Sequence, residues 1–233
     1  MAAQHSSGSS RAGAIIVAAG SSRRMRGVDK LFAPLAGRPV LAHSVAAFVS
    51  HPSIGETVVV TSSANEEATR ALVAELAPRA RVVLGGARRR DSVRAGLEAL
   101  ADCEYVVVHD AARPMVTAAL IDAALEGARE VGAALCAVPI TDTVKRSEPS
   151  GRVSSTVTRQ GLWLAQTPQA FRTDLLLRAH RTVELDVTDD AALIELLGEP
   201  VKLVLGSTRN LKISQPEDLA LARALLAAAE GEA

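Results

Sequence analysis

The sequence predicts an α/β protein with a doubly wound, mostly parallel sheet and a β-hairpin arm that leaves it. Short apolar runs, IIVA at 15–18 and YVVV at 105–108 among them, are bounded by glycine or polar turns, as buried parallel strands are. Segments of helical length lie between these runs, and this alternation predicts a parallel sheet with right-handed crossovers. The alternation breaks over 141–171, where the residues become polar and β-rich.

Length and composition narrow the class of protein. A chain of 233 residues can bury the core of a single α/β domain, which we expect over residues 13–233. Hydrophobic residues make up 48% and aromatic residues 2%, so alanine, valine and leucine must fill that core. Lysine plus arginine equals aspartate plus glutamate at 26 each, so no global field attracts nucleic acid or a membrane. Any basic site must therefore be local.

The first residues and the cysteines indicate the compartment. Residues 1–12 lack the hydrophobic region of a signal peptide, and they are predicted to be a disordered tail. No apolar stretch of the sequence is long enough to span a bilayer. Cys103 and Cys136 lie in or beside apolar runs without metal-ligand spacing, which is typical of reduced core cysteines. We therefore expect a cytoplasmic protein.

The strand at 14–18 leads into a glycine turn that is suited to a polyphosphate. Gly20 lets the backbone approach a ligand closely, and successive N–H groups can surround an anion. A solvated basic turn is the alternative interpretation. Neither G-x-G-x-x-G nor G-x-x-x-x-G-K-[ST] occurs, which argues against a dinucleotide dehydrogenase and a P-loop NTPase. The cations after the turn are Arg23, Arg24, Arg26 and Lys30.

The next elements continue the alternation. A helix is expected over 39–49, because proline is favoured at the first helical position. TVVVT at 57–61 is the next strand. Asn65 can cap a helix that runs to Leu76, with two glutamates in its first turn. RVVL at 81–84 is a further strand.

A second glycine loop follows and repeats the chemistry of the first. Gly85 and Gly86 lead into three arginines and then into a helix that is expected to begin near Asp91 or Ser92. Ser92 can cap this helix, or it can contact a ligand, because a helix N-terminus binds anions and polar groups. Both interpretations of Ser92 remain open at this point.

Asp110 is the candidate metal ligand. It directly follows the strand at 105–109, and ligands of open parallel sheets lie outside the carboxyl ends of the strands. Asp110 should therefore face the same crevice as Gly20, where a carboxylate can hold Mg²⁺ bound to phosphates. The alternative is that Asp110 caps a turn and pairs with Arg113. His109 is interpreted as a structural histidine.

The arm is expected over 141–171, after a helix at 118–131 and a strand at 133–139. A Glu-Pro-Ser-Gly turn at 148–151 separates two strand-like pieces of the arm. An isolated hairpin is marginal in water, so its apolar side chains need a cover. We expect a second subunit to supply it, in a homodimer with an isologous contact. These side chains are Val144, Val153, Val157, Leu162 and Trp163.

The C-terminal part returns to alternating elements. Helices are expected at 173–184 and at 188–197, the second capped by Thr188. A strand at 201–205 follows. The pattern Ser-Gln-Pro-Glu at 214–217 predicts a capping box for a last helix that ends near residue 229.

Several short motifs occur together in a characteristic order. They are Ala18-Ala19-Gly20, Arg24, Lys30, Asp91-Ser92-Val93, His109-Asp110-Ala111-Ala112-Arg113-Pro114, Asp142-Thr143, Thr167-Pro168-Gln169, Thr188-Asp189-Asp190 and Pro216-Glu217-Asp218. In this order and context the sequence resembles the 2-C-methyl-D-erythritol 4-phosphate cytidylyltransferase family. The resemblance runs from about residue 14 to the last helix.

The resemblance implies a Rossmann-like nucleotidyltransferase fold and a β-arm exchanged between the subunits of a homodimer. It implies a reaction of CTP with 2-C-methyl-D-erythritol 4-phosphate that gives 4-diphosphocytidyl-2-C-methyl-D-erythritol and pyrophosphate, in non-mevalonate isoprenoid precursor biosynthesis. Mg²⁺ or another divalent cation is the implied cofactor. Cytidylyltransferases that act on ribitol 5-phosphate share much of the pattern and remain an alternative. A catalytically silent nucleotide-binding module is a second alternative.

The resemblance also implies roles for individual residues. The implied catalytic residues are Arg24, Lys30, Arg159 from the partner's arm, and Lys212. The implied nucleotide-binding residues are Ala18, Ala19, Gly20, Gly85, Gly86, Ser92, Asp110 and Ala111. The implied residues for the acceptor phosphate are Asp110, Arg113, Thr143, Arg159, Thr167, Thr188 and Lys212. Asp110 is the implied metal ligand.

Three positions carry alternatives or departures from the pattern. Arg159 on a polar arm can be a solvated surface charge. Lys212 can be a lysine that protects a sheet edge from aggregation. Family members often carry an acidic residue after the second glycine of the second loop, where it contacts the ribose, but this sequence has Ala87 there. The ribose contact is therefore open.

Overall fold

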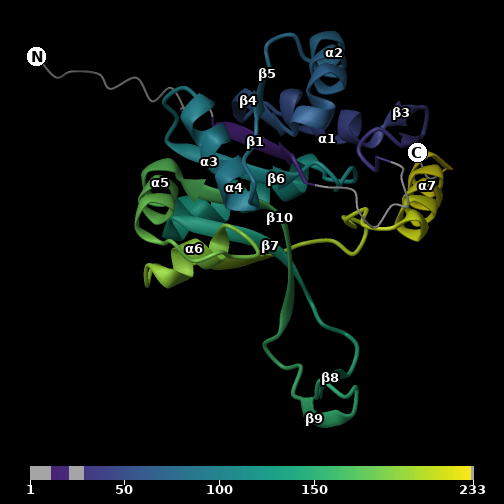
Figure 1. Cartoon of the computed structure of the whole chain (residues 1–233), viewed down its shortest axis with the longest axis vertical. Coiled ribbons are helices and arrows are strands. Elements are labelled where there is room, and N and C mark those ends of the chain that lie inside the picture. Colours follow the sequence, from purple (N-terminus) through teal and green to yellow (C-terminus); the bar gives the residue numbers. More distant parts are fainter. Residues whose placement is uncertain (1–11, 21–28, 232–233) are drawn as a thin grey trace, which may run out of the picture.

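The computed structural model of the chain describes residues 12–20 and 29–231, and its centre is a mostly parallel sheet of seven strands (Figure 1). The strand order is β11-β7-β10-β6-β1-β4-β5. Among these described strands, only β10 runs antiparallel to its neighbours. The doubly wound α/β prediction is confirmed. The strands are β1 (Ala12–Ala18), β4 (Ile54–Thr61), β5 (Arg81–Leu84), β6 (Tyr105–Asp110), β7 (Ala133–Pro139), β10 (Trp163–Arg172) and β11 (Lys202–Leu205).

Helices cover both faces of the sheet. Successive residues of β1 point to opposite faces, so Ile16 packs with Phe48 of α1 while Ile15 packs with Val93 of α3. Burial on both faces explains why the strands read as continuous apolar runs. On the Ile16 face lie α1 (Val40–Val49), α2 (Glu66–Leu76) and α4 (Ala118–Val131). On the Ile15 face lie α3 (Arg89–Ala99), α5 (Thr173–Thr182) and α6 (Ala191–Leu196).

The last helix, α7 (Pro216–Gly231), packs beside a small hairpin of β2 (Pro34–Leu35) and β3 (Arg38–Pro39) (Figure 1). Leu35 and Leu219 are buried in the shared apolar cluster. Ile213, just before α7, joins the cluster, and its N–H donates to the Ala112 carbonyl at 2.8 Å. The C-terminal segment is thereby tied to the loop that follows β6.

The helix starts differ from the predicted ones in several places. The strand β1 begins at Ala12, one residue inside the predicted tail, whose other residues lie outside the described part of the chain. The helix α3 begins at Arg89 and not at Asp91 or Ser92, because the Asp91 carboxylate accepts the Arg88 N–H at 3.3 Å and closes the first turn.

Three predicted side-chain caps are wrong. Asn65 precedes α2, but its side-chain amide donates to the Asp29 carboxylate, and its side chain makes no capping hydrogen bond to the helix. Thr188 does not cap α6, which begins three residues later. At α7 the carboxylate that accepts the N–H groups of residues 214 and 215 belongs to Asp218, not to Glu217. A polar segment often contains several residues that could cap a helix. Contacts with distant parts of the chain determine which of them accepts the N–H groups at the helix start.

The arm is shorter than predicted. The strands β8 (Val144–Ser147) and β9 (Val153–Val157) form a separate two-stranded sheet that lies well away from the main sheet (Figure 1). Residues 163–172, which the prediction assigned to the arm as far as residue 171, form β10 and lie between β6 and β7. The outer ends of β7 and β10, residues 137–139 and 163–165, pair with each other and form the stalk of the arm. Val153 on the arm is 63% exposed, and Leu164 on the stalk is 55% exposed. The described part of the chain therefore leaves these apolar side chains largely uncovered.

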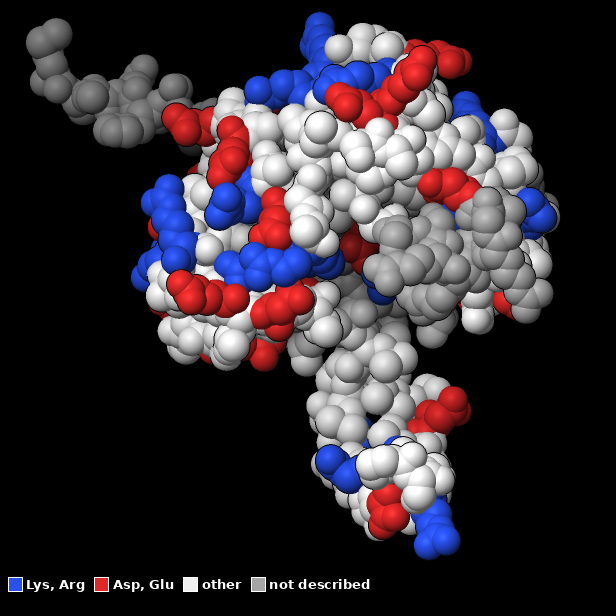
Figure 2. Space-filling view, in the orientation of Figure 1, with Lys and Arg blue, Asp and Glu red and all other residues white. Residues whose placement is uncertain are grey.

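The distribution of surface charge and the state of the two cysteines agree with what the sequence predicts. Figure 2 shows basic and acidic side chains interspersed over the viewed face and at the tip of the arm. Cys103 and Cys136 are both free thiols, and Cys136 is fully buried. Within 12–20 and 29–231, none of the helices combines the length and the apolar character that a membrane span requires.

A close approach of α3 to the sheet predicts the effect of one substitution. A Cβ atom at Gly96 would lie 2.6 Å from Ile15 Cγ2 and 3.1 Å from Val60 Cγ2. Gly96→Ala should lower the free energy of unfolding by about 1–3 kcal/mol through overpacking, although alanine favours helices. Urea unfolding measures this, with the exposed Arg94→Ala in the same helix as a control that should change by less than about 0.5 kcal/mol. A variant as stable as the parent would contradict the close packing.

Candidate active site

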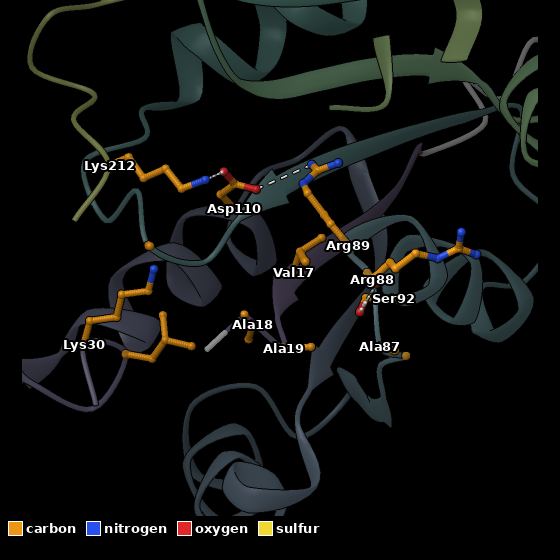
Figure 3. Close-up of a pocket in the computed structure, with 14 residues that line it drawn as sticks. Val17, Ala18, Ala19, Lys30, Ala87, Arg88, Arg89, Ser92, Asp110 and Lys212 are labelled. Atoms are coloured by element: carbon orange, nitrogen blue, oxygen red, sulfur yellow. Dashed lines mark hydrogen bonds and ion pairs between the residues drawn. The ribbon is translucent and has the colours of Figure 1, made fainter. Parts of the chain in front are cut away.

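A cavity of about 360 Å³ opens at the carboxyl ends of β1 and β6 (Figure 3). This is the edge of a parallel sheet where ligands are expected. Lys30 and Asp110 both line it, so the two key side chains of the sequence prediction share one cavity. The lining residues are Val17, Ala18, Ala19, Gly20, Lys30, Leu31, Gly86, Ala87, Arg88, Arg89, Ser92, Asp110, Ala112 and Lys212.

The two glycine loops touch each other at this edge. A Cβ atom at Gly85 would lie 2.6 Å from Ser92 Oγ and 2.7 Å from Ala19 Cβ, so a larger residue would push the loops apart. A Cβ atom at Gly20 would meet nothing within 4 Å among the described residues. The first loop therefore leaves open space above the end of β1, bounded by small residues.

Ser92 and the basic residues are placed as follows. The Ser92 hydroxyl lines the cavity and donates to the Arg88 carbonyl at 3.2 Å, so it also belongs to the first turn of α3. Lys30 and Lys212 lie on the left of the view in Figure 3, across the cavity from Ser92. Arg23, Arg24 and Arg26 lie outside the described residues, and their predicted place near the first loop stays a prediction.

Asp110 is the centre of an ion-pair chain (Figure 3). Its Oδ2 accepts from Lys212 Nζ at 2.6 Å, and its Oδ1 lies 3.5 Å from Arg89 Nη2. Arg89 also donates from Nη1 to Asp190 Oδ2 at 2.6 Å. The alternative of an Asp110–Arg113 side-chain pair is wrong, because Arg113 Nη1 donates to the Asn210 carbonyl at 2.7 Å instead.

The chain of ion pairs keeps its members charged. Burial raises the pKa of Asp110, but Arg89 and Lys212 outweigh it and hold that pKa below its usual range. Burial likewise raises the pKa of Asp190, and Arg89 and His180 bring it below its ordinary value. Burial lowers the pKa of Arg89, while Asp190 and Asp110 raise it more. Two carboxylates and two cations therefore balance at this edge.

A buried hydrogen-bond network supports Asp110 from behind. Thr167 Oγ1 accepts the Asp110 N–H at 3.0 Å and lies 3.1 Å from His109 Nδ1. His109 Nε2 lies 3.1 Å from the Arg113 carbonyl, which can only accept, so Nε2 carries the proton and Nδ1 accepts from the threonine hydroxyl. Burial lowers the pKa of His109 to about 4, so this histidine is neutral and structural, as predicted.

The structure places the predicted site residues in three groups. Ala18, Ala19, Gly20, Lys30, Gly86, Ser92, Asp110 and Lys212 line the cavity, and Gly85 underlies the contact of the two loops. Ala111, Arg113 and Thr167 are buried behind the wall of the cavity; the Ala111 N–H donates to the Val17 carbonyl at 3.0 Å. Thr143, Arg159 and Thr188 are exposed and are not among the described lining residues.

Sequence reasoning missed Arg89 and its partner Asp190. The available signal was the run of three arginines after the second glycine loop. Periodicity does not tell which of the three enters the cavity. The structure resolves it: Arg88 forms a surface pair with Asp91, Arg90 is buried against backbone carbonyls, and Arg89 reaches Asp110.

The single carboxylate in the cavity fits a metal ion that also binds the phosphate groups of a ligand. In the described ranges, no group of three or more histidine, cysteine, aspartate or glutamate side chains could hold a metal ion by itself. Asp110 is the one acidic side chain among the described lining residues. Mg²⁺ commonly takes one or two carboxylates and completes its shell with phosphate oxygens and water. Asp110 meets that requirement.

An open α/β sheet with two glycine loops and cations around one carboxylate defines a nucleotide-binding enzyme of the phosphoryl-transfer type. The model of the family "2-C-methyl-D-erythritol 4-phosphate cytidylyltransferase" matches residues 12–228. The chain therefore belongs to this family, as the sequence motifs predict.

Individual relatives match over nearly the whole chain. The 2-C-methyl-D-erythritol 4-phosphate cytidylyltransferase of Dehalococcoides mccartyi is 46% identical over 218 residues, which cover 93% of this chain and 96% of that protein. The protein of the same name from Pelotomaculum thermopropionicum is 44% identical over 227 residues, with 94% and 95% covered. The crystal structure of the Thermus thermophilus protein of that name has a TM-score of 0.77 at 36% identity and covers 91% of this chain and 97% of its own.

The buried His109 predicts a pH dependence of stability. The pKa of His109 is about 4 in the fold, against about 6.5 when unfolded, so the unfolded chain binds the proton first as the pH falls. Stability should fall between about pH 6.5 and pH 4, by on the order of 3 kcal/mol from this group. His109→Gln should flatten that decline, measured by urea unfolding across the range. An equal decline in the parent and the variant would contradict the assignment.

Proposed function

We propose that the chain transfers the cytidylyl group of CTP to 2-C-methyl-D-erythritol 4-phosphate, giving 4-diphosphocytidyl-2-C-methyl-D-erythritol and pyrophosphate. The product belongs to non-mevalonate isoprenoid precursor biosynthesis. The observation that carries the proposal is the cavity in which two glycine loops meet Lys30, Asp110 and Lys212, in a chain of this family. The relatives reported above carry the methylerythritol name, which favours that acceptor over ribitol 5-phosphate.

The glycine loops form the donor side of the site. Backbone N–H groups of Ala18, Ala19 and Gly20 hold the triphosphate, because small residues let the chain lie against it. Gly85, Gly86, Ser92 and Ala111 hold the cytidine portion. Ala87 brings only a methyl group to the wall of the cavity, so the ribose contact that an acidic residue makes in many family members is not made by this side chain.

The chemical step is an in-line displacement. A phosphate oxygen of the acceptor bonds to the α-phosphorus of CTP while the bond to the β-phosphate oxygen breaks and pyrophosphate leaves. The nucleophile is already an anion, so no strong base is needed. His109 is neutral, buried and hydrogen-bonded on both nitrogens, so it does not supply one. Lys30 and Arg24 stabilise the charge that develops on the phosphoryl group and the leaving pyrophosphate.

Asp110 would hold Mg²⁺ or another divalent cation beside the bound nucleotide, and the cation would supply positive charge that offsets the negative charge of the reacting groups. The contribution of the chain is a carboxylate that stays ionised, because Arg89 and Lys212 lower its pKa. The backbone N–H of Asp110 is held by Thr167, which fixes the position of the carboxylate at the end of β6.

The acceptor side lies toward Lys212. Its ammonium group binds the acceptor phosphate, together with Arg113, Thr143, Thr167 and Thr188. The Lys212 ammonium group donates to Asp110 Oδ2 at 2.6 Å and lines the cavity, so it can also donate to an oxygen of a bound phosphate.

A homodimer completes the site through the arm. The arm and its stalk expose the apolar residues Val153, Trp163 and Leu164. Contact with a second copy of the chain would bury these side chains. In this arrangement Arg159 reaches the acceptor phosphate of the other subunit. The enzyme works in the cytoplasm, without nucleic acid or membrane partners, which its free cysteines and balanced charge support.

The function is tested by incubating the chain with CTP, Mg²⁺ and 2-C-methyl-D-erythritol 4-phosphate and identifying the cytidine diphosphate product. Lys30→Ala should lower kcat by about 10² or more, because one transition-state charge contact is lost. Lys202→Ala, which removes a half-buried lysine that pairs with Glu130 on the edge strand β11, is the control and should keep normal turnover.

Three results would contradict these assignments. Preference for ribitol 5-phosphate would reassign the acceptor. Tight CTP binding without pyrophosphate release would indicate a silent nucleotide-binding module. Normal turnover of Lys30→Ala would remove Lys30 from the mechanism.

The arm is tested at Arg159. Arg159→Ala should raise the KM for the sugar phosphate more than the KM for CTP, because the guanidinium group orients the incoming phosphate. Steady-state kinetics with each substrate varied in turn measure this, and Arg152→Ala at the tip of the arm is the matched comparison. An effect confined to CTP would refute the assignment, and a monomer at working concentration by sedimentation would refute the dimer.

A further inference from the structure

We propose that Arg89 is a positioning residue that holds the segment 183–190 against the first turn of α3 and so couples the nucleotide side of the site to the acceptor side. The inference rests on the proposed function, in which Thr188 of this segment binds the acceptor. Arg89 itself opens α3, directly after the second glycine loop. The Arg89 side chain therefore connects the second glycine loop, which binds the nucleotide, to the segment 183–190, which binds the acceptor phosphate.

The bridge made by Arg89 is buried at its far end. Arg89 Nη1 donates to Asp190 Oδ2 at 2.6 Å, and Nη2 lies 3.5 Å from Asp110 Oδ1. The Asp190 side chain is 1% exposed, so Arg89 is its main charge compensation, with His180 Nε2 at 3.6 Å from the other oxygen. A buried carboxylate without a cation is strongly destabilising, because its charge is neither solvated nor paired, so Asp190 depends on Arg89.

The neighbouring arginine holds the start of the same segment. The Arg90 guanidinium is buried and donates to three carbonyls, those of Leu185 at 2.8 Å, Val183 at 2.6 Å and His180 at 3.1 Å. These carbonyls lie at the end of α5 and just beyond it, where helix carbonyls lack partners within the helix. The first turn of α3 thus binds the segment at both of its ends.

A third contact comes from the sheet. The Gln169 amide of β10 donates to Asp189 Oδ2 at 3.0 Å, and its carbonyl accepts the Ala191 N–H at 3.2 Å. Within the segment, Val183 and Val187 pack against the apolar cluster on the Ile15 face, while Leu185 and Thr188 are exposed. The position of Thr188 therefore depends on these two apolar anchors together with the directed contacts of Arg89, Arg90 and Gln169.

Arginine is needed for the bridge because its planar fork can bind two carboxylates at once. A lysine ammonium is a single point charge and would bind either Asp110 or Asp190. Loss of the fork would leave the nucleotide loop in place, with Gly85 against Ala19, and would loosen the end of the segment that carries Thr188, because the contact of Arg89 with Asp190 is lost. The expected kinetic signature is selective for the acceptor.

The test compares Arg89→Gln, Asp190→Asn and the double variant Arg89→Gln/Asp190→Asn. Each should raise the KM for the acceptor phosphate about tenfold, and the KM for CTP by less than about twofold. The double variant should be no worse than the single ones, because both remove the same bridge. Arg94→Gln, an exposed arginine of the same helix that pairs with Glu98, should match the parent. Additive effects, or a change confined to CTP, would overturn the proposal.

A second measurement does not require activity. Amide hydrogen exchange of residues 183–190 should be faster in each variant than in the parent, with exchange in α4 unchanged. The double variant also guards against misfolding, because it removes the buried carboxylate together with its cation. Unchanged exchange at 183–190 would overturn the inference. If the parent makes no product from CTP and the sugar phosphate, the proposed function fails, while the exchange result still decides whether Arg89 holds this segment.

Discussion

The burial of one carboxylate at the end of β6 constrains much of the molecule. Asp110 is about nine-tenths buried and ionised, so cations must be brought to it. They come from the start of α3 and from the segment before α7, which are far apart in sequence. Three separate parts of the chain therefore meet at one pair of oxygens, and the cavity is the space left between them.

The sheet makes this convergence possible because it is rigid on both faces. Helices α1 and α4 pack on one face, helices α3 and α5 pack on the other, and the end of β6 cannot move independently. The antiparallel strand β10 then contributes Thr167, whose hydroxyl joins the Asp110 backbone to His109. Site residues that touch no ligand are as much a part of the geometry as those that line the cavity.

Sequence reasoning located the strands and the shared edge, because burial on both faces leaves continuous apolar runs and parallel strands end together. It placed α4 and β7 at their observed bounds for the same reason. It failed for β10, whose first three residues are exposed and continue from the arm. It also failed for the caps, because Asp29 binds the Asn65 amide and Asp218 binds the N–H groups before α7. It also could not choose Arg89 from three arginines, since that choice depends on Asp190, about a hundred residues away.

The strands β7 and β10 leave the main sheet and continue into the stalk of the arm, where Trp163 pairs with Pro139. Further along β10, the same backbone carries Thr167, which supports Asp110 at the edge of the cavity. The pairing of β10 with β7 is irregular between Ala165 and Gln169, and Thr167 lies within this irregular stretch. A displacement of the arm would therefore reach the support of Asp110 through the backbone of β10 and not through an unbroken ladder of strand pairing.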